Sequence, residues 1–271
     1  MTSGEAADRP DLSRPNPARM YDYFLGGAHN FDVDRIAADQ VLAITPEIRT
    51  YARENRAFLR RAVRHLVGEA GIDQFLDLGS GIPTVGNVHE IAQAINPAAR
   101  VLYVDHEAVA VAASRRLLAD NPLATIVQAD LRDPAKILAD RDTVALLDFS
   151  RPVAVLMMSV LPFVPESDDP VGIVAGYRNA CADGSYLALS HGLTVDYWPG
   201  GTQGAVAVYQ NTTHPLHPRT PEQIRALFGD LPLIDPGLVL TSAWRPEHPI
   251  TDERAKESRG MAGVGVINRS G

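Results

Sequence analysis

The feature that most constrains this chain is a short apolar strand that runs into a glycine turn at residues 75–84. The strand carries one acid, Asp77, and the turn places Gly79 and Gly81 one residue apart. A helix is predicted from Pro83, because apolar residues then recur at helical spacing and proline suits a first helical position. A strand, a glycine turn and a helix in this order form the nucleotide-binding corner of a doubly wound α/β sheet.

Further apolar runs predict the rest of the sheet. They are continuously apolar rather than alternating, which indicates strands covered on both faces. Because helices separate the first five strands, a mostly parallel sheet with right-handed crossovers is expected. With two closing strands, the prediction is a doubly wound, mostly parallel, seven-stranded Rossmann-like sheet. Besides the strand before the glycine turn, the predicted strands cover residues 100–105, 125–130, 152–160, 186–191, 238–240 and 263–267.

Composition limits the domain organisation and the partners. Residues 1–15 are polar and are expected to form a disordered tail, and residues 16–271 a single domain, since a chain of this length with 45% hydrophobic residues can build one large core. A net charge of −8 argues against nucleic acid as a partner. No apolar run is long enough for a membrane helix, and the first fifteen residues carry no signal-peptide core, so a cytoplasmic protein is expected.

Residues 16–70 are predicted to form a helical extension ahead of the sheet. Asn16 and Pro17 suit the start of a short helix, and Gly26 and Gly27 its end. Two interpretations remain for its aromatic residues: they cover one end of the core, or they form a lid over a ligand. These residues are Tyr21, Tyr23 and Phe24.

Acidic residues at three consecutive strand ends select the nucleotide. Ligands of open α/β sheets bind at the carboxyl ends of the strands, where Asp77, Asp105 and Asp130 are predicted to lie. Asp105 is placed to accept hydrogen bonds from both ribose hydroxyls, and Asp130 from an exocyclic amino group while Leu131 packs on the purine. Alternatively, Asp105 and Asp130 only cap the helices that follow.

The turn itself disfavours a dinucleotide. A third glycine would be needed at Thr84, and Pro83 removes a backbone N–H where a pyrophosphate would bind. Asp77 would also repel that pyrophosphate. An adenosine ligand without phosphates and with a positive centre fits better, and S-adenosylmethionine is such a ligand.

At this point the chain resembles the class I S-adenosylmethionine-dependent methyltransferases, and more closely an actinobacterial family long catalogued as a domain of unknown function. The resemblance spans about residues 14–267. Its most specific element is the segment NPARMYDYFLGG at residues 16–27, followed by HNF at 29–31. The segments at 55–61, 75–83, 103–105 and 168–170 are also similar.

The resemblance implies S-adenosylmethionine as the cofactor and a role for each matching residue. The glycine corner would bind the methionine half, Asp105 the ribose, Asp130 the adenine, and Ser159 the region near the methyl group, with the amino-terminal segment folded over the site. The full set of expected cofactor-binding residues is Asp77, Gly79, Ser80, Gly81, Asp105, His106, Asp130, Leu131, Ser159, Tyr21, Asn30 and Arg60.

The chemistry beyond the cofactor is less constrained. His191 and His29 are the candidates for a general base. Either Arg56 or Arg60 is expected to reach a ligand carboxylate, although a row of arginines on one helix face is more often solvated. Residues 196–198 and the pair His214 and His217 fall where substrate walls are expected. That pair lacks a third ligand, so no metal site is predicted.

The predicted function is methylation, on oxygen or nitrogen, of an unidentified small-molecule acceptor by a monomer or homodimer. The fourth strand lacks the Asn-Pro-Pro-Tyr or Asp-Pro-Pro-Tyr motif of amino-group methyltransferases and continues instead as SVLPF at residues 159–163. Two alternatives stay open: a non-catalytic sensor or scaffold that binds S-adenosylmethionine or S-adenosylhomocysteine, and an NAD(P)-dependent reductase with an atypical corner.

Overall fold

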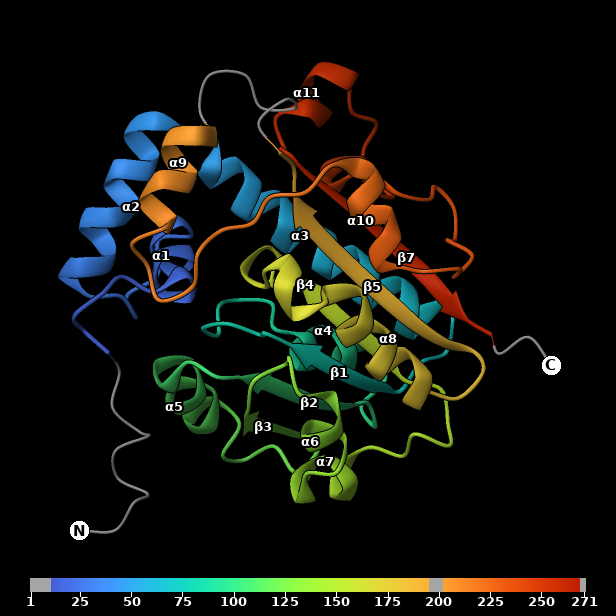
Figure 1. The fold of residues 1–271 in the computed structure, drawn as a ribbon. Helices are drawn as coiled ribbons and strands as arrows, with labels where there is room; N and C mark the ends of the chain where they lie inside the picture. The colour runs from blue at the N-terminus through green and yellow to red at the C-terminus, as the bar shows by residue number, and fades with distance from the viewer. Residues whose placement is uncertain (1–10, 195–201, 269–271) are drawn as a thin grey trace, which may run out of the picture.

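The computed structural model describes residues 11–194 and 202–268 (Figure 1). Its helices are α1 (Pro17–Phe24), α2 (Asp32–Ile44), α3 (Ile48–Gly68), α4 (Val88–Ile95), α5 (Ala108–Leu117), α6 (Pro134–Leu138), α7 (Arg141–Leu146), α8 (Pro170–Ala180), α9 (Thr202–Tyr209), α10 (Pro221–Leu227) and α11 (Asp252–Lys256). Its strands are β1 (Gln74–Leu78), β2 (Arg100–Asp105), β3 (Ala124–Gln128), β4 (Ala154–Met158), β5 (Ser185–Gly192), β6 (Val239–Leu240) and β7 (Gly260–Ile267). Among the described helices, none is both long and apolar enough to cross a bilayer.

The strands form one seven-stranded sheet in the order β3-β2-β1-β4-β5-β7-β6, which confirms the predicted fold class. Strands β1 to β5 pair in parallel, and β7 runs antiparallel to both β5 and β6. The chain starts in the middle of the sheet, winds outward to β3 and then crosses to β4. This reversal places the carboxyl ends of β1, β2 and β4 together, where a ligand cleft is expected.

Both faces of the sheet are covered, as the continuous apolar strands predicted. Leu76 and Leu78 of β1 point to one face and pack with α6, α8 and α10. Phe75 points to the other face and packs with α3, α4 and α5. Because side chains alternate along a strand, Asp77 lies on the same face as Phe75 and therefore faces α3.

The amino-terminal helices form a separate layer with a helix from far along the chain. Met20 and Phe24 of α1 pack with Val41 of α2 and with Ala205 and Tyr209 of α9. Figure 1 shows these three helices together beside the sheet, α1 and α2 in blue and α9 in orange. We call this layer, α1, α2 and α9, the lid; sequence reasoning assigned only its first part.

The helix predicted from Pro83 begins five residues later than expected. Residues 79–87 form an irregular loop, and α4 starts at Val88. The cause is Glu90, whose carboxylate accepts hydrogen bonds from the backbone N–H groups of Gly86 and Asn87, both at 2.8 Å. These bonds satisfy the first free donors of the helix at Asn87, so the helix begins there. Helix α7 was not predicted.

Candidate functional site

A large cavity lies at the carboxyl ends of β1, β2 and β4, between the sheet and the lid. Its empty volume is about 1540 Å³, the open space at its mouth included. The residues that line it fall into a polar half, against the β1 and β2 ends, and an aromatic half, under the lid.

The glycine turn forms the floor of the polar half. Gly79 and Gly81 both have φ of +68°, a conformation that favours glycine, and a Cβ on Gly79 would lie 2.1 Å from a Val160 methyl group. The Oγ of Ser80 is buried and has no hydrogen-bond partner within the described residues. A buried hydroxyl without a partner in a cavity wall is suited to bind a ligand.

Asp105 is fixed at the tip of β2 by two backbone donors. The N–H of Gly81 donates to its Oδ2 at 2.7 Å, and the N–H of Glu107 donates to its Oδ1 at 2.9 Å. The side chain is 5% exposed and lines the cavity. The carboxylate is therefore oriented before any ligand binds, and each oxygen keeps a further lone pair for a hydroxyl donor.

The neighbouring carboxylate of Asp77 has no such hydrogen-bond donors among the described residues. The pKa of Asp77 is raised to about 7: burial raises it most, the Arg56 guanidinium partly opposes this, and the negative charge of Asp105 adds a smaller increase. Within the described part of the chain, no side chain or N–H group donates a hydrogen bond to this carboxylate. Asp77 is thus a buried carboxylate whose ionised form a bound positive charge would stabilise.

The two arginine candidates on α3 separate clearly. Arg56 lines the cavity and donates through Nη2 to the Gly86 carbonyl at 2.9 Å. Arg60 is exposed, and its stem passes Gly86 on the outside of the loop. The structure therefore brings Arg56, and not the expected Arg60, to the polar half.

Aromatic residues form the other half of the cavity. Tyr51 and Ser159 meet through a hydrogen bond between their hydroxyls, and Ser159 has φ of +55° at the end of β4. Tyr21, as expected, also lines this half. The lining aromatic side chains are Tyr21, Phe24, Tyr51, Phe163 and Tyr209. Tyr51, Phe163 and Tyr209 had no predicted role, because an aromatic residue at helical spacing is more often part of a core.

Neither histidine predicted as a base lines the cavity. His29 is exposed. His191 is fully buried: its Nδ1–H donates to the Gly192 carbonyl at 2.7 Å, and its Nε2 accepts from Arg219 at 2.8 Å. Burial lowers the pKa of His191 to about 3. The expectation that His191 acts as a base is therefore corrected, because both of its nitrogens are occupied by structural bonds.

Two other histidines do reach the cavity. His106 follows Asp105, and its ring centroid lies 4.4 Å from that of His214. Burial, together with the neighbouring His106, lowers the pKa of His214 to about 4. Both rings stand next to the ribose acid predicted from the sequence. Among the described residues, no cluster of three or more His, Cys, Asp or Glu side chains could hold a metal ion.

Besides Arg60, three expected cofactor residues lie outside the lining. Asp130 is bound by Arg132, with 2.5 Å between Oδ2 and Nη2, and Arg132 also reaches Asp168 at 2.8 Å. Leu131 is buried in the core. Asn30 donates to the Asp22 carboxylate at 2.9 Å and so supports the end of α1 from behind. Residues 196–198, expected in a substrate wall, lie outside the described residues.

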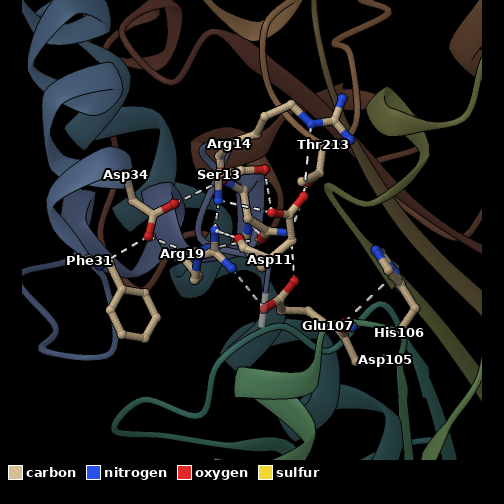
Figure 2. A network of polar contacts seen from close by, with 12 residues as sticks. Asp11, Ser13, Arg14, Arg19, Phe31, Asp34, Asp105, His106, Glu107 and Thr213 are labelled. Atoms are coloured by element: carbon tan, nitrogen blue, oxygen red, sulfur yellow. Dashed lines mark hydrogen bonds and ion pairs between the residues drawn. The ribbon is translucent and has the colours of Figure 1, made fainter. Parts of the chain in front are cut away.

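A buried ion network fastens the lid to the sheet (Figure 2). The Nε of Arg19 bonds to Asp34 at 2.8 Å, and its Nη1 to Glu107 at 3.1 Å. Asn16 donates to the second oxygen of Glu107 at 2.7 Å. The remaining nitrogen, Nη2, donates to the carbonyls of Asp11 and Arg14, so residues 11–14 of the expected tail are bonded to the domain. We call Arg19, Asp34, Glu107 and Asn16 the Arg19 network.

Comparison with known proteins agrees with this geometry. Residues 3–268 match the profile of a family described as S-adenosyl methyltransferase. A proposed methyltransferase from Thermobifida fusca YX is 42% identical, with a TM-score of 0.90 over 95% of this chain and 97% of that one. A DUF574 family protein from Streptomyces avermitilis MA-4680 is 37% identical, with a TM-score of 0.90 over 95% and 99% of the two chains.

More distant structures share the fold alone. Human N-acetylserotonin methyltransferase in complex with S-adenosylmethionine is 13% identical, with a TM-score of 0.51 over 95% of this chain and 64% of that one. No curated protein matches the sequence significantly.

Proposed function

Because the chain belongs to the S-adenosyl methyltransferase family, whose methyl donor is S-adenosylmethionine, we propose that the polar half of its cavity holds this cofactor and the aromatic half a small-molecule acceptor. The observation that carries the proposal is the pair of neighbouring carboxylates at the β1 and β2 ends, Asp77 and Asp105. Asp105 is fixed to accept hydroxyl donors, and Asp77 has no hydrogen-bond donor among the described residues.

The residues present fit the cofactor. When bound, S-adenosylmethionine supplies a methyl group on a positively charged sulfur. Asp105 accepts the ribose hydroxyls, since both of its oxygens are already aimed by backbone donors. Asp77 offsets the positive charge of the methionine half, and Ser80 supplies its unused hydroxyl to the same half. Arg56 faces the carboxylate end.

At the adenine end we assign the contacts to His106 and His214. Both rings line the cavity, His106 directly after Asp105, and either ring can present its face to a purine. Asp130 and Leu131 do not line the cavity, and the Asp130 carboxylate is already bound to Arg132. We therefore propose His106, in the loop after β2, and His214 for the adenine contacts, in place of Asp130 and Leu131 in the loop after β3.

The acceptor is proposed to enter the aromatic half, between the lid and the end of β4. Ser159 and Tyr51 mark the boundary between the two halves. The lid residues of α1 and α9 then align the acceptor with the methyl group and keep water away. Alignment of two bound reactants can supply about 7–11 kcal/mol of the barrier, so positioning is the main task of these residues.

One experiment tests both the cofactor and the acceptor class. Titration calorimetry with S-adenosylhomocysteine and with NADPH is followed by incubation with methyl-labelled S-adenosylmethionine and a cell extract split by ultrafiltration. We expect binding of S-adenosylhomocysteine only, and label in the small-molecule fraction. Label confined to macromolecules would refute the acceptor class. Binding without any transfer would favour the sensor alternative.

A further inference from the structure

We propose that the Tyr209 hydroxyl recognises the methyl acceptor, and that this acceptor is a neutral, flat aromatic molecule with an oxygen that accepts a hydrogen bond. The proposal rests on the proposed function, in which the aromatic half of the cavity is the acceptor site. It names the chemistry of that acceptor, on which the family assignment is silent.

Tyr209 is a buried polar residue without a protein partner. Its side chain closes the carboxyl end of α9, is 5% exposed and lines the cavity. Within the described residues its hydroxyl makes no hydrogen bond, and because it is not among the polar atoms sealed from solvent without a partner, it is open to the cavity. The group that completes this hydroxyl is therefore expected to come from a ligand.

The other two tyrosine hydroxyls of the cavity are already engaged. The hydroxyl of Tyr21 donates to the Ala52 carbonyl at 2.9 Å and accepts from Asn55 at 3.0 Å. The hydroxyl of Tyr51 is paired with that of Ser159. Burial raises the pKa of Tyr209 far above neutrality, with the nearby Tyr51 and Tyr21 hydroxyls contributing. Tyr209 is thus a neutral donor at physiological pH.

The walls define the shape of the acceptor. The Tyr209 ring lies 5.9 Å from that of Phe163, tilted by 46°, so the two rings pack against each other and form one continuous aromatic wall from the lid to the loop after β4. Phe24 and Tyr21 extend this surface along α1. Aromatic walls of this kind favour a flat ring over an aliphatic chain.

The charges define its polarity. The acidic side chain lining this half is Asp22, and its carboxylate is used by the backbone of His29 at 2.8 Å and by Asn30 at 2.9 Å. The arginine in the lining, Arg56, belongs to the polar half. An anionic acceptor would be buried among aromatic side chains and beside the Asp22 carboxylate without a counter-ion, which is strongly unfavourable. A neutral oxygen facing Tyr209 satisfies both partners.

The test uses three probes of equal ring size with the protein saturated in S-adenosylhomocysteine: 2-naphthol, naphthalene and 2-naphthoate. Calorimetry at pH 7.5 should show 2-naphthol binding about three- to tenfold more tightly than naphthalene, the range of one neutral hydrogen bond. The Tyr209→Phe variant should lose this preference and bind naphthalene unchanged. The carboxylate should bind more weakly than 2-naphthol.

Tyr23→Phe is the matched control, because its hydroxyl bonds to Asp39 on the outside of the lid at 3.0 Å. It should keep the wild-type preference. A preference for 2-naphthol that survives in Tyr209→Phe, tighter binding of 2-naphthoate, or no binding of any probe would overturn the inference. Failure of S-adenosylhomocysteine to bind the wild type would instead overturn the proposed function, which separates the two.

Discussion

Two neighbouring groups of buried carboxylates in this molecule differ in their partners: one group is ion-paired, and the other contains a carboxylate without a hydrogen-bond donor in the described part of the chain. In the Arg19 network, Asp34 and Glu107 share one fully buried guanidinium, and each of its three nitrogens has a partner (Figure 2). In the cavity floor, Asp77 has no donor within the described residues and a pKa raised to about 7 by burial. The paired charges join the lid to the loop after β2, and we propose that the Asp77 carboxylate faces the positive charge of the cofactor.

The two groups meet in one loop. Asp105 and Glu107 are two residues apart, and the Glu107 N–H donates to Asp105. Glu107 in this loop is therefore bound to Arg19 of the lid, whereas Asp105 faces the cavity. Changes in the two groups are expected to differ in kind: in the network they affect the folded state, and in the floor they affect ligand binding.

The largest effect is expected for Arg19→Met. Removing the guanidinium leaves Asp34 and Glu107 buried without a cation, which costs about 3–5 kcal/mol in the free energy of unfolding. Urea unfolding followed by circular dichroism measures the loss. The control is Arg64→Met, whose ion pair with Glu247 is exposed and contributes about 0–1 kcal/mol. Equal losses in the two variants would contradict the contrast drawn here.

Asp105→Ala comes next and should act on the cofactor. Loss of a carboxylate that accepts two ribose hydroxyls is expected to weaken S-adenosylhomocysteine binding about tenfold or more, at about 1.5–3 kcal/mol per bond to a charged group. Calorimetry measures the dissociation constant. Asp130→Ala is the matched control and should change it less than about twofold, because Asp130 lies outside the lining. A larger effect of Asp130→Ala would restore the adenine role predicted from the sequence.

Asp77 gives a smaller effect with a distinctive pH dependence. Its carboxylate binds a cation only when ionised, so wild-type affinity for S-adenosylmethionine, whose sulfur is positively charged, should fall as the pH is lowered from 8 to 6, through the pKa of about 7. The Asp77→Asn variant should bind more weakly at pH 8 and show a flatter profile. The flanking charges, Arg56 and Asp105, are kept in both proteins. An unchanged slope in the variant would assign the titration to another group.

Replacing Asp77 should have the opposite effect on stability: Asp77→Asn weakens ligand binding at pH 8 but should raise the free energy of unfolding at that pH. A folded-state pKa raised above the unfolded value of 3.8 means that stability is present below about pH 4 and is lost as the pH rises to about 7. Without ligand, Asp77→Asn should therefore be more stable than the wild type at pH 8 and similar to it at pH 4. Thermal unfolding at the two pH values measures this. A variant less stable at pH 8 would mean that Asp77 has a structural partner.

The sequence predicted what depends on local pattern. The family, the seven-stranded sheet, S-adenosylmethionine as cofactor and the acids at the β1 and β2 ends are confirmed, because strand periodicity and strand order place these acids without knowledge of side-chain packing. The missed features depend on contacts between distant segments. Tyr209 reaches the cavity only because α9 packs on α1 and α2, and His191 is bonded to Arg219, 28 residues further along the chain.

Neighbouring arginines on α3 show the same limit and give the smallest predicted effect. Both were candidates for a ligand carboxylate, and one helical turn decides between them: Arg56 lines the cavity, whereas Arg60 is exposed. Arg56→Met should weaken S-adenosylhomocysteine binding about two- to tenfold, the range of one partly exposed charged contact, and Arg60→Met should leave it within about twofold. Calorimetry at low and moderate salt distinguishes them, since screening should reduce the Arg56 effect. A greater loss in Arg60→Met would show that the loop at residues 79–87 moves when the cofactor binds.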